Sequence, residues 1–249
     1  LGSDWCHFGF FTGSLGWALE WLSLKLPWDQ VIALSQQTKN KLQARGINPE
    51  RITVIYPGVN QDEFTLPAEK RAGTTVCMIA RLVAYKRVAD GVKLMAELKS
   101  ELPGIKLLVI GEGPQKGRLM KLAQDLGVAG RIYWKSRLPR KNLIQALKSC
   151  QILCHLSAVE GFGLVILEAL AAGLPYVAYA TPINQEVTYG GTGGVLVPVG
   201  NWREAATAAK RLLIDQQFYR QKVAEGKKLL KSYLWAEAAA QTEAVYGSL

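Results

Sequence analysis

Residues 157–175, which read SAVEGFGLVILEALAAGLP, constrain the fold of this chain more than any other stretch. The apolar run 151–156 before them predicts a short buried strand. From Leu164 the apolar residues follow a helical period, which Gly173 and Pro175 end. The unit is therefore expected to be a strand, a glycine-rich loop and a helix.

Such a loop leaves backbone amides free at the start of the helix, here those of Gly163, Leu164 and Val165. Free amides and the positive end of the helix dipole favour a bound phosphate. Glu168 lies further along the same helix, where its two oxygens could accept hydrogen bonds from the vicinal hydroxyls of a ribose. Two alternatives are an ion-paired core glutamate and a membrane span, but the charge, Gly173 and Pro175 disfavour a span.

The segment matches the pattern Glu-Gly-Phe-Gly-Leu-x-x-x-Glu-Ala-x-Ala-x-Gly-x-Pro at every position, with Glu160 and Glu168 as its two glutamates. In this it resembles the retaining glycosyltransferases of family 4, also called glycosyl transferases group 1. The resemblance implies the GT-B architecture of two Rossmann-like domains. It further implies that this chain holds the C-terminal, donor-binding domain together with an incomplete N-terminal domain.

The order of the expected elements predicts the same fold class, α/β with a doubly wound parallel sheet. After residue 74, strands alternate with helices over short connections, so the ligand is expected beyond the carboxyl ends of the strands. The expected strands are 76–80, 106–110, 131–134, 151–156, 176–180 and 194–197, and the helices between them are 88–99, 116–126, 141–149 and 164–173. The tail from Asn201 is expected to be helical.

Four parts of the chain are expected. Residues 1–60 would be the remnant of an acceptor-side domain, with strands 30–34 and 52–56 around a helix 36–45 capped by Ser35. The polar run 61–73 is expected to be a linker, and residues 74–232 are expected to form the nucleotide-sugar-binding domain. Residues 233–249 are expected to form a helix that crosses back to the first domain. The aromatic-rich segment 1–28 favours a helix from Ser14 packed in a core over a helix on a membrane surface.

The formal net charge of +10 implies attraction to anions. Nucleotides, phosphorylated substrates and acidic lipids all satisfy it, whereas the scattered lysines and arginines form no stripe for a nucleic acid. The four cysteines have no paired spacing and indicate buried thiols in a reducing compartment: they are Cys6, Cys77, Cys150 and Cys154. The expected location is the cytoplasm, with peripheral contact at the inner face of the membrane as an addition.

Two cations, Arg81 and Lys86, follow the strand 76–80, where an arginine fork and a lysine point charge could bind phosphate oxygens. Basic residues at strand ends are more often solvated surface, but the resemblance implies that this pair holds the donor diphosphate. Gly111 and Gly113 lack the third glycine of a dinucleotide fingerprint. The resemblance implies instead that they let the backbone approach the nucleotide.

Two further positions, Ser136 and Arg137, follow from the resemblance. They correspond to a loop that borders the base, although the family usually has glycine where Ser136 stands.

His155 precedes the signature by five residues. It is expected to be a packed strand residue rather than a catalytic base.

The predicted activity is retaining transfer of a hexose-type sugar from a UDP-, GDP- or ADP-linked donor to a lipid or polysaccharide acceptor. Arg81, Lys86 and the helix amides would stabilise the departing diphosphate, and Glu160 would position the sugar. The chain has no Asp-x-Asp motif, so neither an obligatory metal ion nor another cofactor is expected. A split enzyme that needs a missing domain or partner chain, a non-catalytic nucleotide-sugar-binding subunit and a sugar-nucleotide epimerase remain as alternatives.

Overall fold

The computed structural model describes residues 16, 19, 22–23, 26–65 and 74–248. The chain forms two compact units. The smaller comprises Leu1–Gly58 together with Tyr233–Leu249, and the larger comprises Val59–Ser232.

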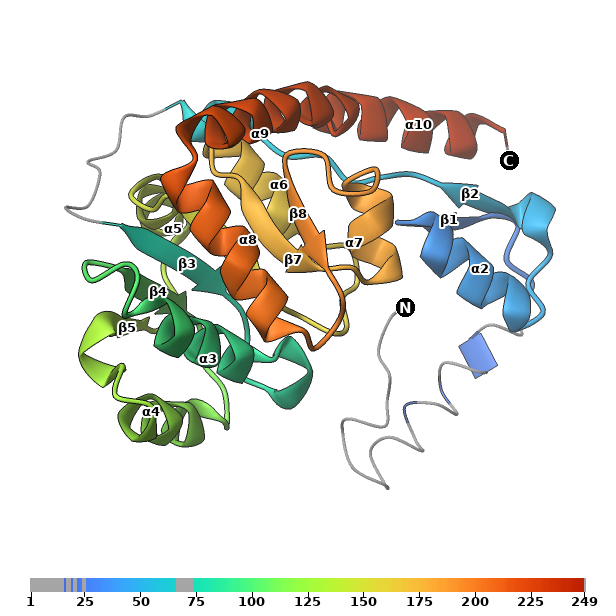
Figure 1. Cartoon of the computed structure of the whole chain (residues 1–249). Coiled ribbons are helices and arrows are strands. Elements are labelled where there is room, and N and C mark those ends of the chain that lie inside the picture. Colours follow the sequence, from blue (N-terminus) through green and yellow to red (C-terminus); the bar gives the residue numbers. More distant parts are fainter. Residues whose placement is uncertain (1–15, 17–18, 20–21, 24–25, 66–73, 249) are drawn as a thin grey trace. The chain divides into compact units, whose positions relative to one another are not determined.

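The larger unit is built on a six-stranded sheet with the order β5-β4-β3-β6-β7-β8, in which every pair of neighbours is parallel (Figure 1). Its strands are β3 (Thr75–Ile79), β4 (Lys106–Ile110), β5 (Ile132–Lys135), β6 (Ile152–His155), β7 (Tyr176–Tyr179) and β8 (Gly194–Val197). The predicted doubly wound parallel sheet is thus confirmed. The chain runs outward from β3 to β5 and then returns to place β6 on the other side of β3. This reversal puts the topological switch point, where α/β proteins bind ligands, between β3 and β6.

Helices cover both faces of this sheet. The helices of the larger unit are α3 (Val88–Leu98), α4 (Lys116–Asp125), α5 (Arg140–Lys148), α6 (Leu164–Ala171), α7 (Pro182–Val187), α8 (Trp202–Ile214) and α9 (Gln216–Leu229). In Figure 1, α3 and α8 lie in front of the sheet, whereas α5 and α6 lie behind it. The sheet is therefore a central layer, and its strands are apolar on both faces, as expected for a covered parallel sheet.

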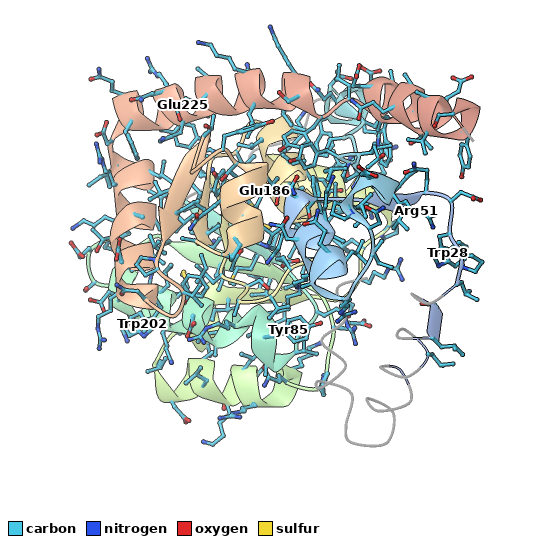
Figure 2. All side chains as sticks on the ribbon, turned by 90° about the vertical axis from the view of Figure 1, so that its right-hand side faces the viewer. Trp28, Arg51, Tyr85, Glu186, Trp202 and Glu225 are labelled. Carbon is cyan, nitrogen blue, oxygen red and sulfur yellow. The ribbon has the colours of Figure 1, made fainter. Side chains whose placement is uncertain are left out.

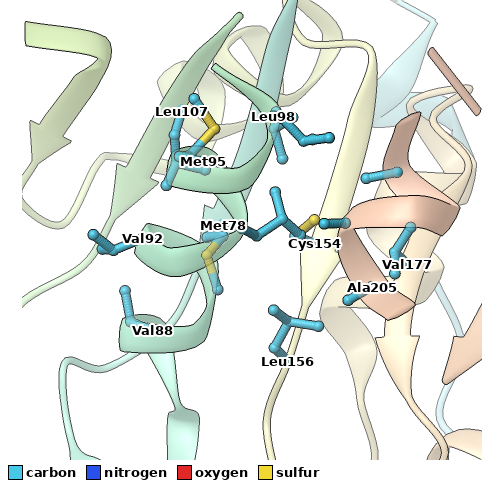
Figure 3. Close-up of a cluster of buried hydrophobic side chains, with 14 of the residues drawn as sticks. Met78, Val88, Val92, Met95, Leu98, Leu107, Cys154, Leu156, Val177 and Ala205 are labelled. Carbon is cyan, nitrogen blue, oxygen red and sulfur yellow. The ribbon is translucent and has the colours of Figure 1, made fainter. Parts of the chain in front are cut away.

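Figure 3 shows the core beneath α3 and α8. Alternate residues of the strands point into it, among them Met78 of β3 and Cys154 of β6, and both are at most 2% exposed. They meet Val92 and Met95 of α3 and Ala205 of α8. The small alanine side chains of α8 allow this helix to approach α3 and the sheet closely, because no bulky group separates the layers.

The smaller unit contains a parallel pair of strands, β1 (Val31–Ala33) and β2 (Ile52–Val54), joined by α2 (Gln36–Ala44). Ser35 caps α2 as predicted, since its side chain accepts a hydrogen bond from Thr38 N. The helix α10 (Trp235–Gly247) belongs to the same unit. A Cβ atom on Gly58 would lie 2.2 Å from the backbone nitrogen of Trp235, so only glycine permits this approach of the chain to the start of α10.

The stretch 61–73, predicted as a linker, begins as a 3-10 helix, Gln61–Phe64. Phe64 is 5% exposed, and its carbonyl accepts a hydrogen bond from Lys148 Nζ at 2.7 Å. Gln61 also donates to the carbonyl of Leu230. The buried side chain of Phe64 and these two hydrogen bonds therefore hold residues 61–64 against the rest of the larger unit. Residues 66–73 lie outside the described part of the chain.

Residues Pro182–Val187 form the helix α7, which Thr181 caps. One further expectation differs from the structure. Most of the helix expected from Ser14 falls outside the described residues. Leu19 and Leu22, which are described, are more than half exposed rather than packed in a core.

Three of the four cysteines, Cys77, Cys150 and Cys154, are buried thiols that form no disulfide, as predicted, and Cys6 lies outside the described residues. Burial raises the pKa of Cys154 to about 12, so this thiol stays protonated and unreactive. Within the described ranges, every helix is too short or too polar to cross a membrane.

Candidate functional site

A cavity of about 770 Å³ opens in the larger unit at the carboxyl ends of its central strands. It is lined by the last residues of β3, β4 and β6 and by the segments that follow them. The wall contains three arginines and one lysine against two glutamates: Arg81, Lys86, Arg137, Arg140, Glu112 and Glu160. The cavity thus lies at the switch point of the sheet and has a net positive wall, which suits an anionic ligand.

The glycine turn after β4 shapes one wall by contacting the segment after β3. A Cβ atom on Gly111 would lie 1.9 Å from the carbonyl oxygen of Ala80, and one on Gly113 would lie 2.5 Å from that of Leu82. Leu82 N also donates to the carbonyl of Glu112 at 2.8 Å. The two glycines therefore allow close contact with the backbone on either side of Arg81, and Gly111 itself lines the cavity.

Lys86, His155 and Glu160 meet in the cavity and are called here the lysine cluster. Lys86 Nζ donates to Glu160 Oε1 at 2.5 Å. His155 Nε2 lies 2.9 Å from the same oxygen, within ion-pair distance but without the alignment of a hydrogen bond. The three side chains are between 5% and 17% exposed, so this is a largely buried charge network.

Backbone contacts hold this cluster together. Lys86 ends the 3-10 turn Ala84–Lys86, on which Tyr85 lies (Figure 2). The carbonyl of Tyr85 accepts a hydrogen bond from Ala158 N at 2.8 Å, which ties the turn to the loop that carries Glu160. Residues distant in the sequence are thereby fixed side by side.

The cluster keeps Glu160 ionised. Burial alone would raise its pKa, but His155 and Lys86 outweigh burial and lower the pKa from 4.5 to about 2. Glu160 is therefore a fixed negative charge at every physiological pH. It can accept hydrogen bonds from sugar hydroxyls, but it cannot donate a proton.

The helix α6 begins at Gly163, whose φ of 85° is in the left-handed region that favours glycine. No side chain caps this end of the helix. Val165, in its first turn, lines the cavity. The start of α6 therefore presents backbone donors close to Arg81 and Lys86, the arrangement that binds phosphate groups in other α/β folds.

Glu63, Arg140 and Glu168 form a second network, called here the arginine cluster. Arg140 Nη1 donates to Glu168 Oε1, and its Nε and Nη2 atoms both lie 2.8 Å from Glu63 Oε2. The guanidinium also lies over the ring of Phe64, 5.5 Å from its centroid. Burial would lower the pKa of Arg140, but hydrogen bonds to Glu168 and Glu63 raise it, so this arginine remains charged.

The structure brings six of the eleven sequence-predicted site residues to the wall of the cavity. They are Arg81, Lys86, Gly111, Arg137, Glu160 and Val165. The other five do not line it. Gly113, Ser136 and Leu164 are adjacent in sequence to residues that do, and Gly163 lies two positions before Val165. Glu168 binds Arg140, which lines the cavity.

Sequence reasoning missed four lining residues with polar or charged side chains: Tyr85, Glu112, Arg140 and His155. His155 is buried at the end of β6 as expected, yet its ring faces Glu160. Its position as the last residue of a strand at the switch point is a signal that could have identified it. Arg140 gave no such signal, because its partners are distant in the sequence.

Among the residues with described positions, no group of three or more histidine, cysteine, aspartate or glutamate side chains is placed to hold a metal ion.

Two family descriptions match the chain: Glycosyl transferases group 1 over residues 61–229 and Glycosyltransferase Family 4 over residues 5–63. An exopolysaccharide phosphotransferase of Streptomyces coelicolor is 32% identical over 77% of this chain and 20% of its own length. A D-inositol 3-phosphate glycosyltransferase of Mycobacteroides abscessus is 30% identical over 75% of this chain and 44% of its own length. The chain thus spans less than half the length of these relatives.

Solved structures share the fold. HepE of Anabaena, in complex with UDP and glucose, matches 89% of this chain and 64% of its own with a TM-score of 0.80 and 20% identity. Sucrose-phosphate synthase of Thermosynechococcus elongatus matches 94% of this chain and 61% of its own with a TM-score of 0.80 and 24% identity. With the family match over residues 61–229, these likenesses show that the chain belongs to the glycosyl transferases group 1, family 4, with the GT-B fold.

Proposed function

We propose that this chain is the donor-binding part of a retaining glycosyltransferase that transfers a hexose from a UDP-linked donor to a polysaccharide or lipid acceptor. The observation that carries the proposal is the cavity at the switch point, whose wall includes Arg81, Lys86, Val165 of the first turn of α6 and Glu160, with Lys86 and Glu160 in an ion pair. The choice of UDP is supported by HepE, which has been crystallised with UDP-glucose. The acceptor class is supported by the name of the Streptomyces relative.

In this proposal the donor diphosphate lies between Arg81, Lys86 and the first amides of α6. Arg81 is exposed and supplies a planar fork, whereas Lys86 is largely buried and supplies a point charge. The ammonium of Lys86 has three protons, so it can bind a phosphate while it keeps its bond to Glu160. Breaking the sugar–phosphate bond leaves negative charge on the nucleotide, and these donors stabilise it in the transition state.

Glu160 would accept hydrogen bonds from hydroxyls of the transferred sugar. Its fixed negative charge also stabilises positive character that develops at the anomeric carbon when the bond to phosphate lengthens. Retention of the anomeric configuration is carried over from the family resemblance.

The nucleoside would occupy the side of the cavity formed by Gly111, Arg137 and the arginine cluster. Glu168 would accept hydrogen bonds from the ribose hydroxyls, and the loop with Ser136 and Arg137 would border the base.

The test is a thermal-shift panel of UDP-, GDP- and ADP-glucose with the full chain. Ligand binding raises the melting temperature by mass action, so UDP-glucose should produce the largest shift. Arg81→Ala should lose most of this shift, whereas Arg203→Ala, an exposed arginine stacked on Trp202, should keep it. Equal shifts for wild type and Arg81→Ala would contradict the proposed diphosphate site.

Transfer is measured separately with a radiolabelled donor and polysaccharide or lipid acceptors, and free sugar is scored as hydrolysis. Transfer to an acceptor supports the enzymatic role. Binding of the donor without transfer or hydrolysis would instead identify a nucleotide-sugar-binding subunit, and conversion of the donor to its epimer would identify an epimerase.

A further inference from the structure

We propose that Arg140 is a positioning residue for ribose recognition: it fixes the carboxylate of Glu168 so that this group accepts hydrogen bonds from the nucleotide's 2′- and 3′-hydroxyls. The inference rests on the proposed function, because it assumes that a nucleotide occupies the cavity. It assigns a role to Arg140, which the sequence signature does not contain.

The first support is the position of Arg140. It begins α5 and lines the cavity, while its Nη1 atom binds Glu168 on α6. Glu168 follows Val165, another lining residue, by three positions, so both side chains lie on the same face of α6. The carboxylate of Glu168 is 17% exposed and therefore lies just behind the wall, where a ribose hydroxyl could reach it beside Arg140.

The second support is how the contact uses the carboxylate. Arg140 binds Oε1, and within the described part of the chain the carboxylate of Glu168 has no second partner. A carboxylate offers about four acceptor positions, so a diol could use Oε2 and the remaining lone pair of Oε1. A glutamate held at one oxygen also loses less side-chain freedom when the ribose binds.

The third support is the way Arg140 is itself held. Its other nitrogen atoms contact Glu63, and its guanidinium lies over Phe64, so both ends of the contact are restrained. Two carboxylates against one guanidinium give the arginine cluster a net charge of −1. A cluster with this charge repels a phosphate but accepts hydrogen bonds from neutral hydroxyls, which favours a role in ribose binding rather than in diphosphate binding.

The experiment compares UDP with 2′,3′-dideoxy-UDP by titration calorimetry on the full chain. Wild type should bind UDP roughly tenfold more tightly, because the dideoxy compound lacks the hydroxyls that Glu168 would bind. In Arg140→Ala the ratio of the two affinities, UDP over dideoxy-UDP, should fall to a value between about 1 and 3, mainly through weaker binding of UDP. Glu168→Ala should give the same low ratio, and the double variant should show no further loss.

The matched control is Arg211→Ala. Arg211 also stacks on a phenylalanine, Phe218, and lies 4.0 Å from a carboxylate, that of Asp215, but it does not line the cavity. This variant removes the same charge and should keep the wild-type ratio. If Arg140→Ala does not fold, the affinity ratio is measured in Arg140→Lys instead, because this variant keeps the positive charge but loses the planar fork of the guanidinium.

A wild-type ratio in both Arg140 variants would overturn the inference. An equal loss of affinity for UDP and dideoxy-UDP would also overturn it, since Arg140 would then contact the base or the phosphates. A higher ratio in Arg140→Ala would overturn it as well and show that Arg140 blocks Glu168. If wild type binds neither compound, the proposed function fails. If it binds both equally, only the ribose assignment fails.

Discussion

The two signature glutamates lie in different electrostatic surroundings, although they are eight positions apart in the sequence. Glu160 belongs to the lysine cluster, whose side chains are at most 17% exposed. Glu168 belongs to the arginine cluster, in which the side chains of Arg140 and Glu63 are 43% and 36% exposed and that of Glu168 is 17% exposed. The lysine cluster is thus buried throughout, whereas the arginine cluster is exposed at Arg140 and Glu63.

This difference indicates two kinds of function. A buried ammonium next to a buried carboxylate creates fixed charges in a low-dielectric site, which suits the stabilisation of developing charge. The guanidinium of Arg140 is 43% exposed, so water screens much of its charge, but its planar fork sets the direction of the two carboxylates that it contacts. We therefore expect the lysine cluster to dominate stability and chemistry, and the arginine cluster to dominate selectivity.

The largest expected effect is that of Lys86→Met. It leaves Glu160 buried without its main cation, and breaking such a pair should lower the free energy of unfolding by about 3 kcal/mol. Urea denaturation measures this change. Adding Glu160→Gln should restore much of the loss, because the unpaired charge is then removed. A loss below about 1 kcal/mol would show that the pair is not effectively buried.

The second effect concerns binding. Glu168→Ala should weaken UDP binding by on the order of 2 kcal/mol, because the ribose hydroxyls lose their hydrogen-bond acceptor. The melting temperature of the free protein should change little. Glu186→Ala, in the short helix α7, serves as the control and should leave the affinity unchanged, because Glu186 is not among the residues that line the cavity. Unchanged affinity in Glu168→Ala would remove this residue from the site.

The third effect is a pH dependence that only the lysine cluster should show. The pKa of Glu160 lies near 2 in the folded chain and near 4.5 when the chain is unfolded. Its contribution to stability is therefore present above about pH 4.5 and is lost as the pH falls towards 2. Wild type should lose about 2.5 kcal/mol more than Glu160→Gln over this window. Parallel losses, measured by urea denaturation at several pH values, would contradict the assignment.

The smallest effect sets the scale for exposed pairs. Lys121 and Asp125 on α4 form an ion pair at 3.0 Å, with side chains 74% and 56% exposed. Lys121→Ala should lower the free energy of unfolding by less than about 0.5 kcal/mol and leave UDP binding unchanged. A larger loss in the same denaturation assay would mean that exposure is a poor guide to the strength of the two clusters.

Local patterns were enough to predict the sheet. The strands 106–110 and 194–197 match β4 and β8 at both ends, because runs of buried apolar residues between turns determine them. The strand order also follows from chain connectivity in doubly wound folds. The role of Phe64 was missed, because one apolar residue in a polar run does not reveal which surface it packs against.

The site was predictable to the extent that its residues follow strand ends. Arg81, Lys86 and Glu160 all come directly after a strand or in the loop that follows it, and the fold gathers such positions at one edge of the sheet. Arg140 was not predictable, since it acts through Glu63 and Glu168, which are 77 and 28 positions away. Contacts of this range depend on tertiary packing rather than on local pattern.

The most direct test of the central claim is a calorimetric titration of the full chain with UDP and with uridine, at low and at high salt. If Arg81, Lys86 and the start of α6 bind a diphosphate, UDP should bind roughly 100-fold more tightly than uridine, and salt should weaken only UDP binding. Equal affinities of UDP and uridine, unchanged by salt, would contradict the claim that this cavity is a diphosphate site.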